Sequence, residues 1–387
     1  MKKIHTLLLL TGIIWALAQN ALAQQPTLVP IPTRLSVEQD SAKKGDIIDG
    51  QWVAIGIKKP NAILHDYTNL FNGKPSYRFS LEVGDNTLAD YGGKGTKGRA
   101  ELSYAYATHD DFKNLPERTY HDDLIMKGVY LHGKGMVPQG SSDSYAFSFY
   151  LPADFPSNTN TIFAQWHGMP NRTVVTAPGD KATKLSVDDF VELCKRMTFK
   201  EDKGYDKIKS TDKNGNIVYK IADKPNGWRV EQGGYPPLAF GFSDGYFYIK
   251  ANSESSWMTD NSDRTNANVK RTPIMQPLKS VYKASTIAYK LPFEDFPKGR
   301  WITFNINITW STYGREAQTI IKPGKLDIQM AYTDNGKAVK KHIVDNQQIL
   351  VGRNDDNGYY FKFGIYRLGS STVPVSYNLA GFSQRVN

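Results

Sequence analysis

Apolar and polar residues alternate with a period of two in many short segments of this chain. The pattern is clearest in SYRFSLEV from Ser76, SYAFSFYL from Ser144, LAFGFSDGYFYIKA from Leu238, WITFNINITW from Trp301 and KLDIQMAYT from Lys325. Successive side chains of a strand point to opposite faces, so this alternation predicts half-buried strands. Asp, Asn and Gly clusters between the segments are typical of hairpin turns. We therefore expect an all-β fold, a two-sheet β-jelly-roll sandwich.

One segment, residues 169–228, is charged and irregular and breaks this pattern. Within it, Ser186 can cap a helix that runs through VDDFVELCKRM. We expect a thumb-like insertion containing this helix, with residues 24–168 and 229–387 forming the jelly-roll domain. The insertion also contains STDKNGNIVY, which resembles a degenerate calcium loop. Asn214-Gly215 between strand-like flanks is more typical of a plain hairpin.

The first residues have the order of a secretory signal peptide. A basic start precedes an apolar run from Leu7 to Ala18, and small residues follow at Ala21 and Ala23. We therefore expect residues 1–23 to be removed during export to a bacterial periplasm. No later stretch approaches the roughly 20 apolar residues of a bilayer crossing, so we expect no membrane span.

The net charge points to an acidic partner. It is +10 for the whole sequence, and +8 once Lys2 and Lys3 are removed. An exported basic protein is more suited to an acidic glycan than to nucleic acid, although many exported proteins are basic and bind no polyanion. The 22 Tyr, 18 Phe and 7 Trp suit a sugar-binding β-surface, but most of them can equally fill a large core. Nothing in the sequence indicates more than a monomer.

Three predicted strands carry polar residues at alternate positions, which places these residues on one face of each strand. The segments are KGRAELSY with Arg99 and Glu101, FAQWHG with Gln165 and His167, and YYFKFGIYR with Tyr360, Lys362, Gly364 and Tyr366. Each has a purely structural explanation, such as a cross-strand ion pair or a hydrogen-bonded histidine. Together they would line a groove on the concave sheet of a sandwich.

These residue types suit elimination from a uronate sugar. Removal of the C5 proton requires that the neighbouring carboxylate be neutralised, which Arg99 and Gln165 can do through a cation and an amide. Histidine as a residue type titrates near working pH, so His167 suits the base, while the hydroxyl of Tyr366 can protonate the departing oxygen. Lys362 could stabilise the phenolate of Tyr366 or hold a sulfate.

The same segments resemble the motif strands of jelly-roll alginate lyases, and the chain as a whole is more similar to the heparin lyase I family of bacterial polysaccharide lyases. The similarity includes NGKPSYRF, SSDSYAFSFYLP, KPNGWRVEQGGYP and GRNDDNGYYFKFGIYR. It implies a jelly roll with a thumb, heparin and highly sulfated heparan sulfate as substrates, and a 4,5-unsaturated uronate product. It also implies that His167 is the base, Tyr366 the acid or second base, and Arg99 and Gln165 the carboxylate neutralisers.

The resemblance further implies a calcium ion. The matching positions are Glu231, the carbonyl of Trp257, Asn354 and Asp355, and hard oxygen ligands of this kind fit calcium better than zinc. Without the resemblance, 354–357 would be interpreted as a turn. The metal-like sequences His109-Asp110-Asp111 and His121-Asp122-Asp123 are interpreted as solvent-facing turns.

A sulfated substrate requires a basic groove. Besides Glu101 on the groove wall, the candidate substrate-binding residues are Lys74, Lys97, Arg229, Lys340, Lys341 and Lys362, with Arg78 and Lys94 as further cations. Lys340-Lys341-His342 resembles a short heparin-binding cluster, but a solvated edge strand explains it equally well.

Two other functions remain open at this stage. One is a non-catalytic module that binds sulfated glycans on the same sandwich, and the other is a lyase for an unsulfated uronan such as alginate. A non-catalytic module would not need an ordered histidine and tyrosine pair.

Overall fold

The structure is a computed structural model. It describes residues 47–49, 51–55, 61–85, 98–105, 135–157, 159–168, 173–175, 183–184, 208–211, 217–220, 229–230, 236–255, 283–314, 319–354, 358–369 and 373–386. The predicted signal peptide lies outside these residues. No helix in the described part of the chain is long and apolar enough to cross a bilayer.

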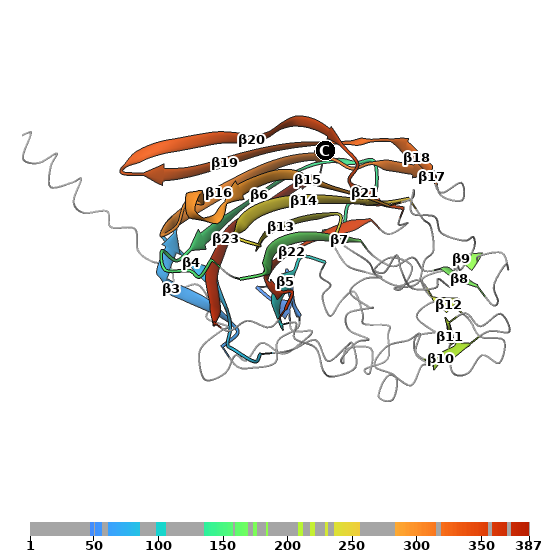
Figure 1. Cartoon of the computed structure of the whole chain (residues 1–387), viewed down its shortest axis with the longest axis horizontal. Helices are drawn as coiled ribbons and strands as arrows, with labels where there is room; N and C mark the ends of the chain where they lie inside the picture. Colours follow the sequence, from blue (N-terminus) through green and yellow to red (C-terminus); the bar gives the residue numbers. More distant parts are fainter. Residues whose placement is uncertain are drawn as a thin grey trace, which may run out of the picture. The chain divides into compact units, whose positions relative to one another are not determined.

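The first large sheet has nine strands. They are β1 (Ile47–Ile48), β2 (Trp52–Ile55), β5 (Gly98–Ser103), β22 (Tyr359–Arg367), β7 (Thr161–Gly168), β13 (Leu238–Ser243), β14 (Tyr246–Glu254), β15 (Lys283–Pro292) and β21 (Gly352–Arg353). The first eight follow each other across the sheet in that order, and β21 joins β14 (Figure 1). The path is antiparallel throughout, whereas β21 runs parallel to β14.

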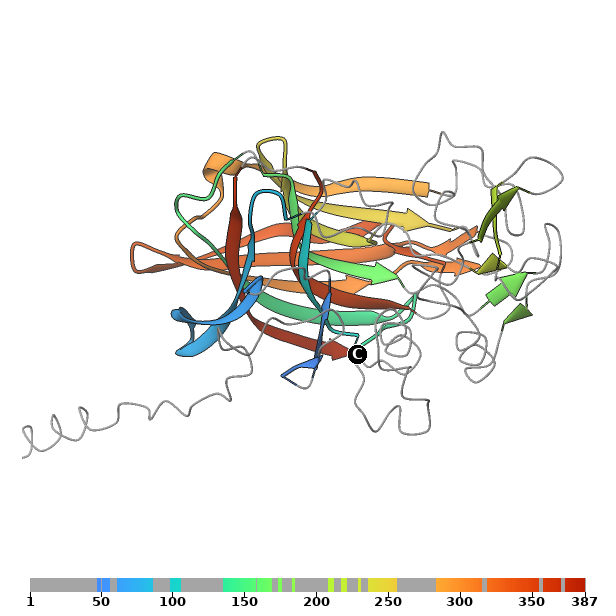
Figure 2. The same ribbon diagram turned by 90° about the horizontal axis from the view of Figure 1, so that it is seen from below.

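The second large sheet has seven strands. Across the sheet they are β20 (Lys337–Ile349), β19 (Gly324–Asp334), β16 (Arg300–Thr309), β6 (Ser142–Leu151), β23 (Val375–Val386), β4 (Lys74–Leu81) and β3 (Ile63–Phe71). A short 3-10 helix, η4 (Phe293–Asp295), follows β15, and β17 (Thr312–Gly314) pairs with β18 (Thr319–Lys322). Figures 1 and 2 show the sheets in views at right angles. The predicted all-β sandwich of jelly-roll type is confirmed.

Turn chemistry fixes two of the hairpins that the sequence predicts. Asp244 and Gly245 join β13 to β14 with φ of 53° and 75°, and Asn335 and Gly336 join β19 to β20 with φ of 47° and 74°. Two consecutive positive φ angles define the turn that matches the twist of a tight hairpin, and Asp, Asn and Gly tolerate them best. The alternating strand segments are therefore paired in the register that buries their apolar positions.

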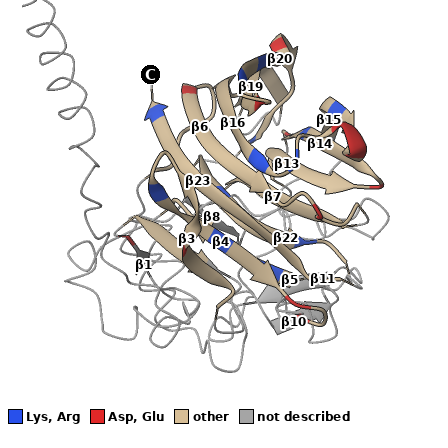
Figure 3. Ribbon diagram, turned by 90° about the vertical axis from the view of Figure 1, so that its left-hand side faces the viewer, with Lys and Arg blue, Asp and Glu red and all other residues tan. Residues whose placement is uncertain are grey.

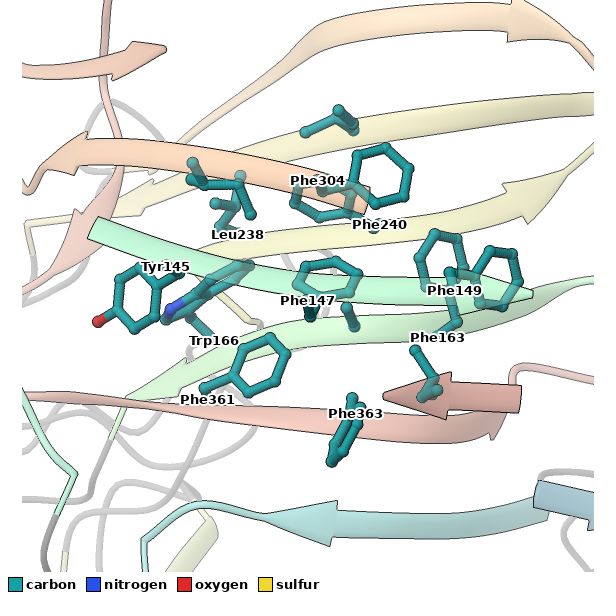
Figure 4. Close-up of a cluster of buried hydrophobic side chains, with 14 of the residues drawn as sticks. Tyr145, Phe147, Phe149, Phe163, Trp166, Leu238, Phe240, Phe304, Phe361 and Phe363 are labelled. Carbon is teal, nitrogen blue, oxygen red and sulfur yellow. The ribbon is translucent and has the colours of Figure 1, made fainter. Parts of the chain in front are cut away.

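Aromatic side chains from both sheets fill the core between them (Figure 4). Phe149 of β6 stacks on Phe163 of β7, with ring centroids 4.1 Å apart, and Phe147 of β6 lies 5.5 Å from Phe361 of β22. All four rings are buried. This packing fixes which face of β7 and β22 points away from the core.

The predicted insertion contributes small sheets of its own. Its strands are β8 (Thr173–Val175), β9 (Thr183–Lys184), β10 (Ile208–Thr211) and β11 (Ile217–Lys220), and β12 (Arg229–Val230) follows directly after it. They form a three-stranded sheet, β12-β8-β9, and a β10-β11 pair. The antiparallel β10-β11 pair supports the hairpin interpretation around Asn214-Gly215. The predicted helix after Ser186 lies outside the described residues.

Candidate active site

The three motif strands lie next to one another in the nine-stranded sheet, in the order β5-β22-β7. The paired positions are Tyr366 with Arg99, Gly364 with Glu101, Lys362 with Gln165, and Tyr360 with His167. Paired residues share a face, so these residues all point to the side away from the core. We call this side the motif face. The opposite side is closed by buried Ala100, Leu102, Trp166, Phe361 and Phe363.

Glu101 connects most of the motif face. Its carboxylate is only 1% exposed, accepts a hydrogen bond from Nε2 of Gln165, and pairs with Nε of Arg99 at 2.9 Å. Nζ of Lys362, itself 2% exposed, lies 3.9 Å from the same carboxylate. A buried charge is stable only when it is paired and hydrogen-bonded. Glu101 therefore holds Arg99, Gln165 and Lys362 in fixed positions, which suits positioning better than direct substrate contact.

The Glu101→Gln variant is expected to lose about 3 kcal/mol of unfolding free energy, at the low end for breaking a buried ion pair. The neutral amide no longer balances the charges of Arg99 and Lys362, although Lys362 can lose its proton, which limits the destabilisation. Urea unfolding measures the change, with exposed Glu294→Gln as the matched control within about 0.5 kcal/mol of wild type. Equal stability of the two variants would show that the carboxylate does not hold the motif face together.

Lys362 has an unusual environment for a lysine. Burial lowers its pKa to about 8, Glu101 opposes this shift, and the charge of Arg99 adds to it. Its ammonium group also lies 5.7 Å from the ring of Tyr360. The lysine is therefore part of the packed charge network of the motif face.

His167 has the form that a general base requires. Its Nδ1 lies 2.9 Å from the carbonyl oxygen of Gly168, and because a carbonyl can only accept, Nδ1 carries the hydrogen. The lone pair of the neutral ring is then on Nε2. Burial, together with the charges of Lys362, Arg353 and Arg99, lowers the pKa of His167 well below 6.5, against the opposing effect of the Gly168 hydrogen bond. The imidazole is therefore neutral at neutral pH.

Two tyrosines share the motif face, and they differ in exposure. Tyr360 lies nearest His167, with ring centroids 5.8 Å apart, but it is buried. Tyr366 is partly exposed, and the guanidinium of Arg99 lies 4.7 Å above its ring. Arg99 thus lies against Tyr366 and also acts electrostatically on His167. A partly exposed tyrosine beside a cation is the better candidate for an acid that must reach substrate.

The backbone beside Tyr366 requires glycine. Gly364 has a φ of 132°, and an added Cβ would lie 2.3 Å from the carbonyl oxygen of Ala100. From the other sheet, the hydroxyl of Tyr377 donates to the Gly364 carbonyl at 2.9 Å. The β22–β7 register shifts at this point, between Phe363 and Tyr366. This local irregularity sets where Tyr366 lies relative to β7.

The structure does not bring all the predicted cations to the motif face. Lys and Arg occur on strands of both large sheets (Figure 3). Lys74 is on β4, and Lys340 and Lys341 are on the edge strand β20, all in the seven-stranded sheet. The prediction that these three lysines join one groove with Lys362 is therefore corrected, because clustering in sequence does not decide which sheet a strand enters. Lys97 and the side chain of Arg229 lie outside the described residues.

The predicted calcium ligands are only partly described. Asn354 is buried, and its Nδ2 donates to the carbonyl oxygens of Ser255 and Gly314 at 2.9 and 3.1 Å. Glu231, Trp257 and Asp355 lie outside the described residues. Among the described residues, Asp327, His342 and Asp345 could also hold a metal, but His342 already hydrogen-bonds to Asp327 in the other sheet. That group needs no ion to explain it.

Sequence reasoning missed one charged residue near the base. Arg353 on β21 is buried, and its charge contributes to the lowered pKa of His167. Its segment was interpreted only through the possible metal ligands that follow it. The pairing of β21 with β14, which brings it into the nine-stranded sheet, joins residues about a hundred positions apart and leaves no local sequence signal.

The fold and the motif face together define a class of protein. A β-sandwich with an arginine, an amide, a neutral histidine and a tyrosine on one wall has the groups needed for uronate elimination. In agreement, residues 42–378 match the polysaccharide lyase family, and the chain belongs to this family. It is also 57% identical over 365 residues to heparin lyase I of Pedobacter heparinus, covering 94% of this chain and 95% of that protein.

Solved structures of alginate lyases match this chain at low identity and low TM-score. One is alginate lyase AlyC3, with 11% identity, a TM-score of 0.34, and coverage of 89% of this chain and 86% of that chain. Another is an alginate lyase of Pseudomonas aeruginosa, with 11% identity, a TM-score of 0.32, and coverage of 85% and 88%.

Proposed function

We propose that this lyase cleaves heparin and highly sulfated heparan sulfate by β-elimination, at the linkage from glucosamine to 2-O-sulfo-iduronate. The observation that carries the proposal is the gathering of Arg99, Gln165 and Lys362 around buried Glu101, beside a neutral His167. The choice of a sulfated substrate is supported by the 57% identity to a protein named heparin lyase I.

Each motif residue has one role in the proposed reaction. Arg99 and Gln165 bind the uronate carboxylate, which makes the C5 proton more acidic and stabilises the charge that develops there. His167 takes this proton on Nε2. The electrons form the C4–C5 double bond as the C4–O4 bond breaks, and Tyr366 protonates the departing oxygen. Glu101 keeps the two carboxylate-binding groups in position.

The experiment compares activity on heparin, chondroitin sulfate and alginate. Each elimination creates a conjugated double bond that absorbs in the ultraviolet, and we expect the fastest rise with heparin. A faster rise with alginate would favour the unsulfated-uronan alternative. Binding to heparin with no rise on any of the three would favour a non-catalytic glycan-binding module.

The pH dependence follows from the environment of His167. Because the base must be neutral and its pKa is lowered, the acidic limb of kcat/KM is expected below pH 6.5. Lys362→Met removes one of the cations that lower this pKa, so the limb should move to higher pH. Rate profiles of both proteins on heparin test this. A wild-type limb at or above pH 6.5, or an unmoved limb in the variant, would contradict the account.

We further propose a calcium ion held by Glu231, the carbonyl of Trp257, Asn354 and Asp355. Two hydrogen bonds fix the amide nitrogen of Asn354, which turns its side-chain oxygen away from these acceptors. Glu254 and Arg353 are paired in parallel strands. The segments that continue to Trp257 and to Asp355 therefore start from adjacent positions. Oxygen donors from separate segments suit calcium, which would link these segments together.

Calcium at 100 times its dissociation constant is expected to stabilise the protein by about 2.7 kcal/mol over the chelated form. Thermal unfolding with calcium and with a chelator measures this difference. Asp355→Ala should remove most of the calcium effect, whereas Asp345→Ala, an exposed member of the other acidic group, should retain it. If Asp345→Ala lost the stabilisation by calcium and Asp355→Ala kept it, the calcium site would be assigned to the group on β19 and β20 instead.

Export, domain limits and oligomeric state are also proposals. We propose a periplasmic monomer without residues 1–23, with a jelly-roll domain of residues 24–168 and 229–387 and a thumb of residues 169–228. N-terminal sequencing and light scattering of the protein from a periplasmic extract test the processing and the oligomeric state.

A further inference from the structure

The motif face continues across the nine-stranded sheet beyond β7. Gln165 on β7 pairs with Ala239 on β13, and Ala239 pairs with Lys250 on β14. Paired positions on neighbouring strands share a face, so Lys250 points to the same side as Gln165. Two strand spacings separate them, about 9.5 Å between backbones. Lys250 therefore belongs to the same wall as the candidate active site, further from the reacting bond.

The burial of β14 confirms this orientation. Phe247, Ile249 and Ala251 are buried in the core, whereas Tyr248 and Lys250, which alternate with them, are partly exposed. Ala239, which lies between Gln165 and Lys250 in the sheet, has only a methyl side chain. In the sheet, only a methyl group therefore lies between the side chains of Gln165 and Lys250.

Lys250 has no counter-ion in the part of the chain that the structure describes. Its two cross-strand neighbours are Ala239 and Ile287, which carry no charge. On its own strand, the amide of Asn252 bonds to the Pro236 carbonyl and to Ser285. A partly buried ammonium is favourable only with an anionic partner or water. Because Lys250 is partly exposed and unpaired among the described residues, its ammonium is available to an anion from solution.

We propose that Lys250 forms an anion-binding subsite, which binds a sulfate or carboxylate of a sugar beyond the bond being cleaved. The proposal rests on the proposed function, since it extends the same substrate along the same wall. A lysine is a point charge on a flexible stem, so it can meet anionic groups at several positions on a sugar. Lys250 would thus favour long, densely charged chains over short ones.

The experiment compares Lys250→Gln with Lys250→Arg and with Lys325→Gln as the matched control. Lys325 is exposed on β19 in the seven-stranded sheet, away from the motif face. On long heparin fragments, Lys250→Gln should lower kcat/KM about tenfold, as expected for loss of one contact between charged groups. On a fragment too short to occupy the Lys250 subsite, it should match wild type. Lys250→Arg should retain most activity.

A second readout does not depend on turnover. The salt dependence of heparin binding reports how many cations contact the polyanion, and Lys250→Gln should reduce its slope by about one. Desulfated heparin and carboxyl-reduced heparin distinguish the two anions. Removing the anion that Lys250 binds should weaken the binding of wild type more than the binding of Lys250→Gln.

Two outcomes would overturn the proposal. One is a wild-type salt slope in Lys250→Gln, and the other is a loss of kcat/KM that is the same at every fragment length. Failure of the proposed function gives a different result, since wild type would then form no unsaturated product while the change in binding slope could still appear. Thermal unfolding of each variant checks that the fold is retained.

Discussion

His167→Ala is expected to lower kcat on heparin by about 10²- to 10⁴-fold, with nearly unchanged heparin binding. The variant lacks the only group on the described motif face that is held neutral with a free ring nitrogen, because Nδ1 donates to Gly168. Binding depends on cations that the substitution leaves in place. Single-turnover kinetics measure the chemical step, and calorimetry measures the affinity.

The histidine loss must be separated from a loss of structure. His65 on β3 is the control, because it is a histidine of the other sheet, and His65→Ala should leave kcat unchanged. An equal loss in both variants would point to folding. A large loss of binding in His167→Ala, with kcat retained, would make His167 a contact residue.

Tyr366→Phe is expected to lower kcat by a similar factor, about 10²- to 10⁴-fold, because it removes the hydroxyl that protonates the leaving oxygen. The ring remains, so its contact with the guanidinium of Arg99 is retained. The loss should be smaller on a substrate whose leaving group needs no protonation, such as a uronate that carries a phenol of low pKa through O4. Rates on the two substrates measure this difference.

Tyr360→Phe is the matched control for Tyr366→Phe. Tyr360 lies closer to His167 in the register, but its burial keeps its hydroxyl from substrate. We therefore expect Tyr360→Phe to retain most of kcat. If Tyr360→Phe lost activity and Tyr366→Phe did not, the acid would be assigned to the tyrosine opposite His167.

The sequence predicted the strands and the shared face well, for a physical reason. Alternation within each motif strand fixes which residues point away from the core, and the sheet then needs only to place the three strands together. The pairings of Tyr366 with Arg99 and of Lys362 with Gln165 meet that condition. Turns such as Asp244-Gly245 were equally predictable, because their backbone angles restrict residue type.

The remaining features depend on contacts between distant segments. The sequence does not show that Glu101 is buried among the side chains of Arg99, Gln165 and Lys362. It also does not show that the charge of Arg353 on β21 lowers the pKa of His167. It also could not assign Lys74 and Lys340 to the opposite sheet, since their local patterns are those of any exposed strand. Such features follow from strand order, which alternation does not encode.

The most direct test is mass spectrometry of the products from a size-defined heparin fragment, with wild type and with His167→Ala. Elimination conserves atoms, so the two wild-type product masses should add up to the substrate mass, and His167→Ala should leave the substrate almost intact. Products that together exceed the substrate by one water would indicate hydrolysis. That result, or wild-type cleavage by His167→Ala, would contradict the assignment of the motif face.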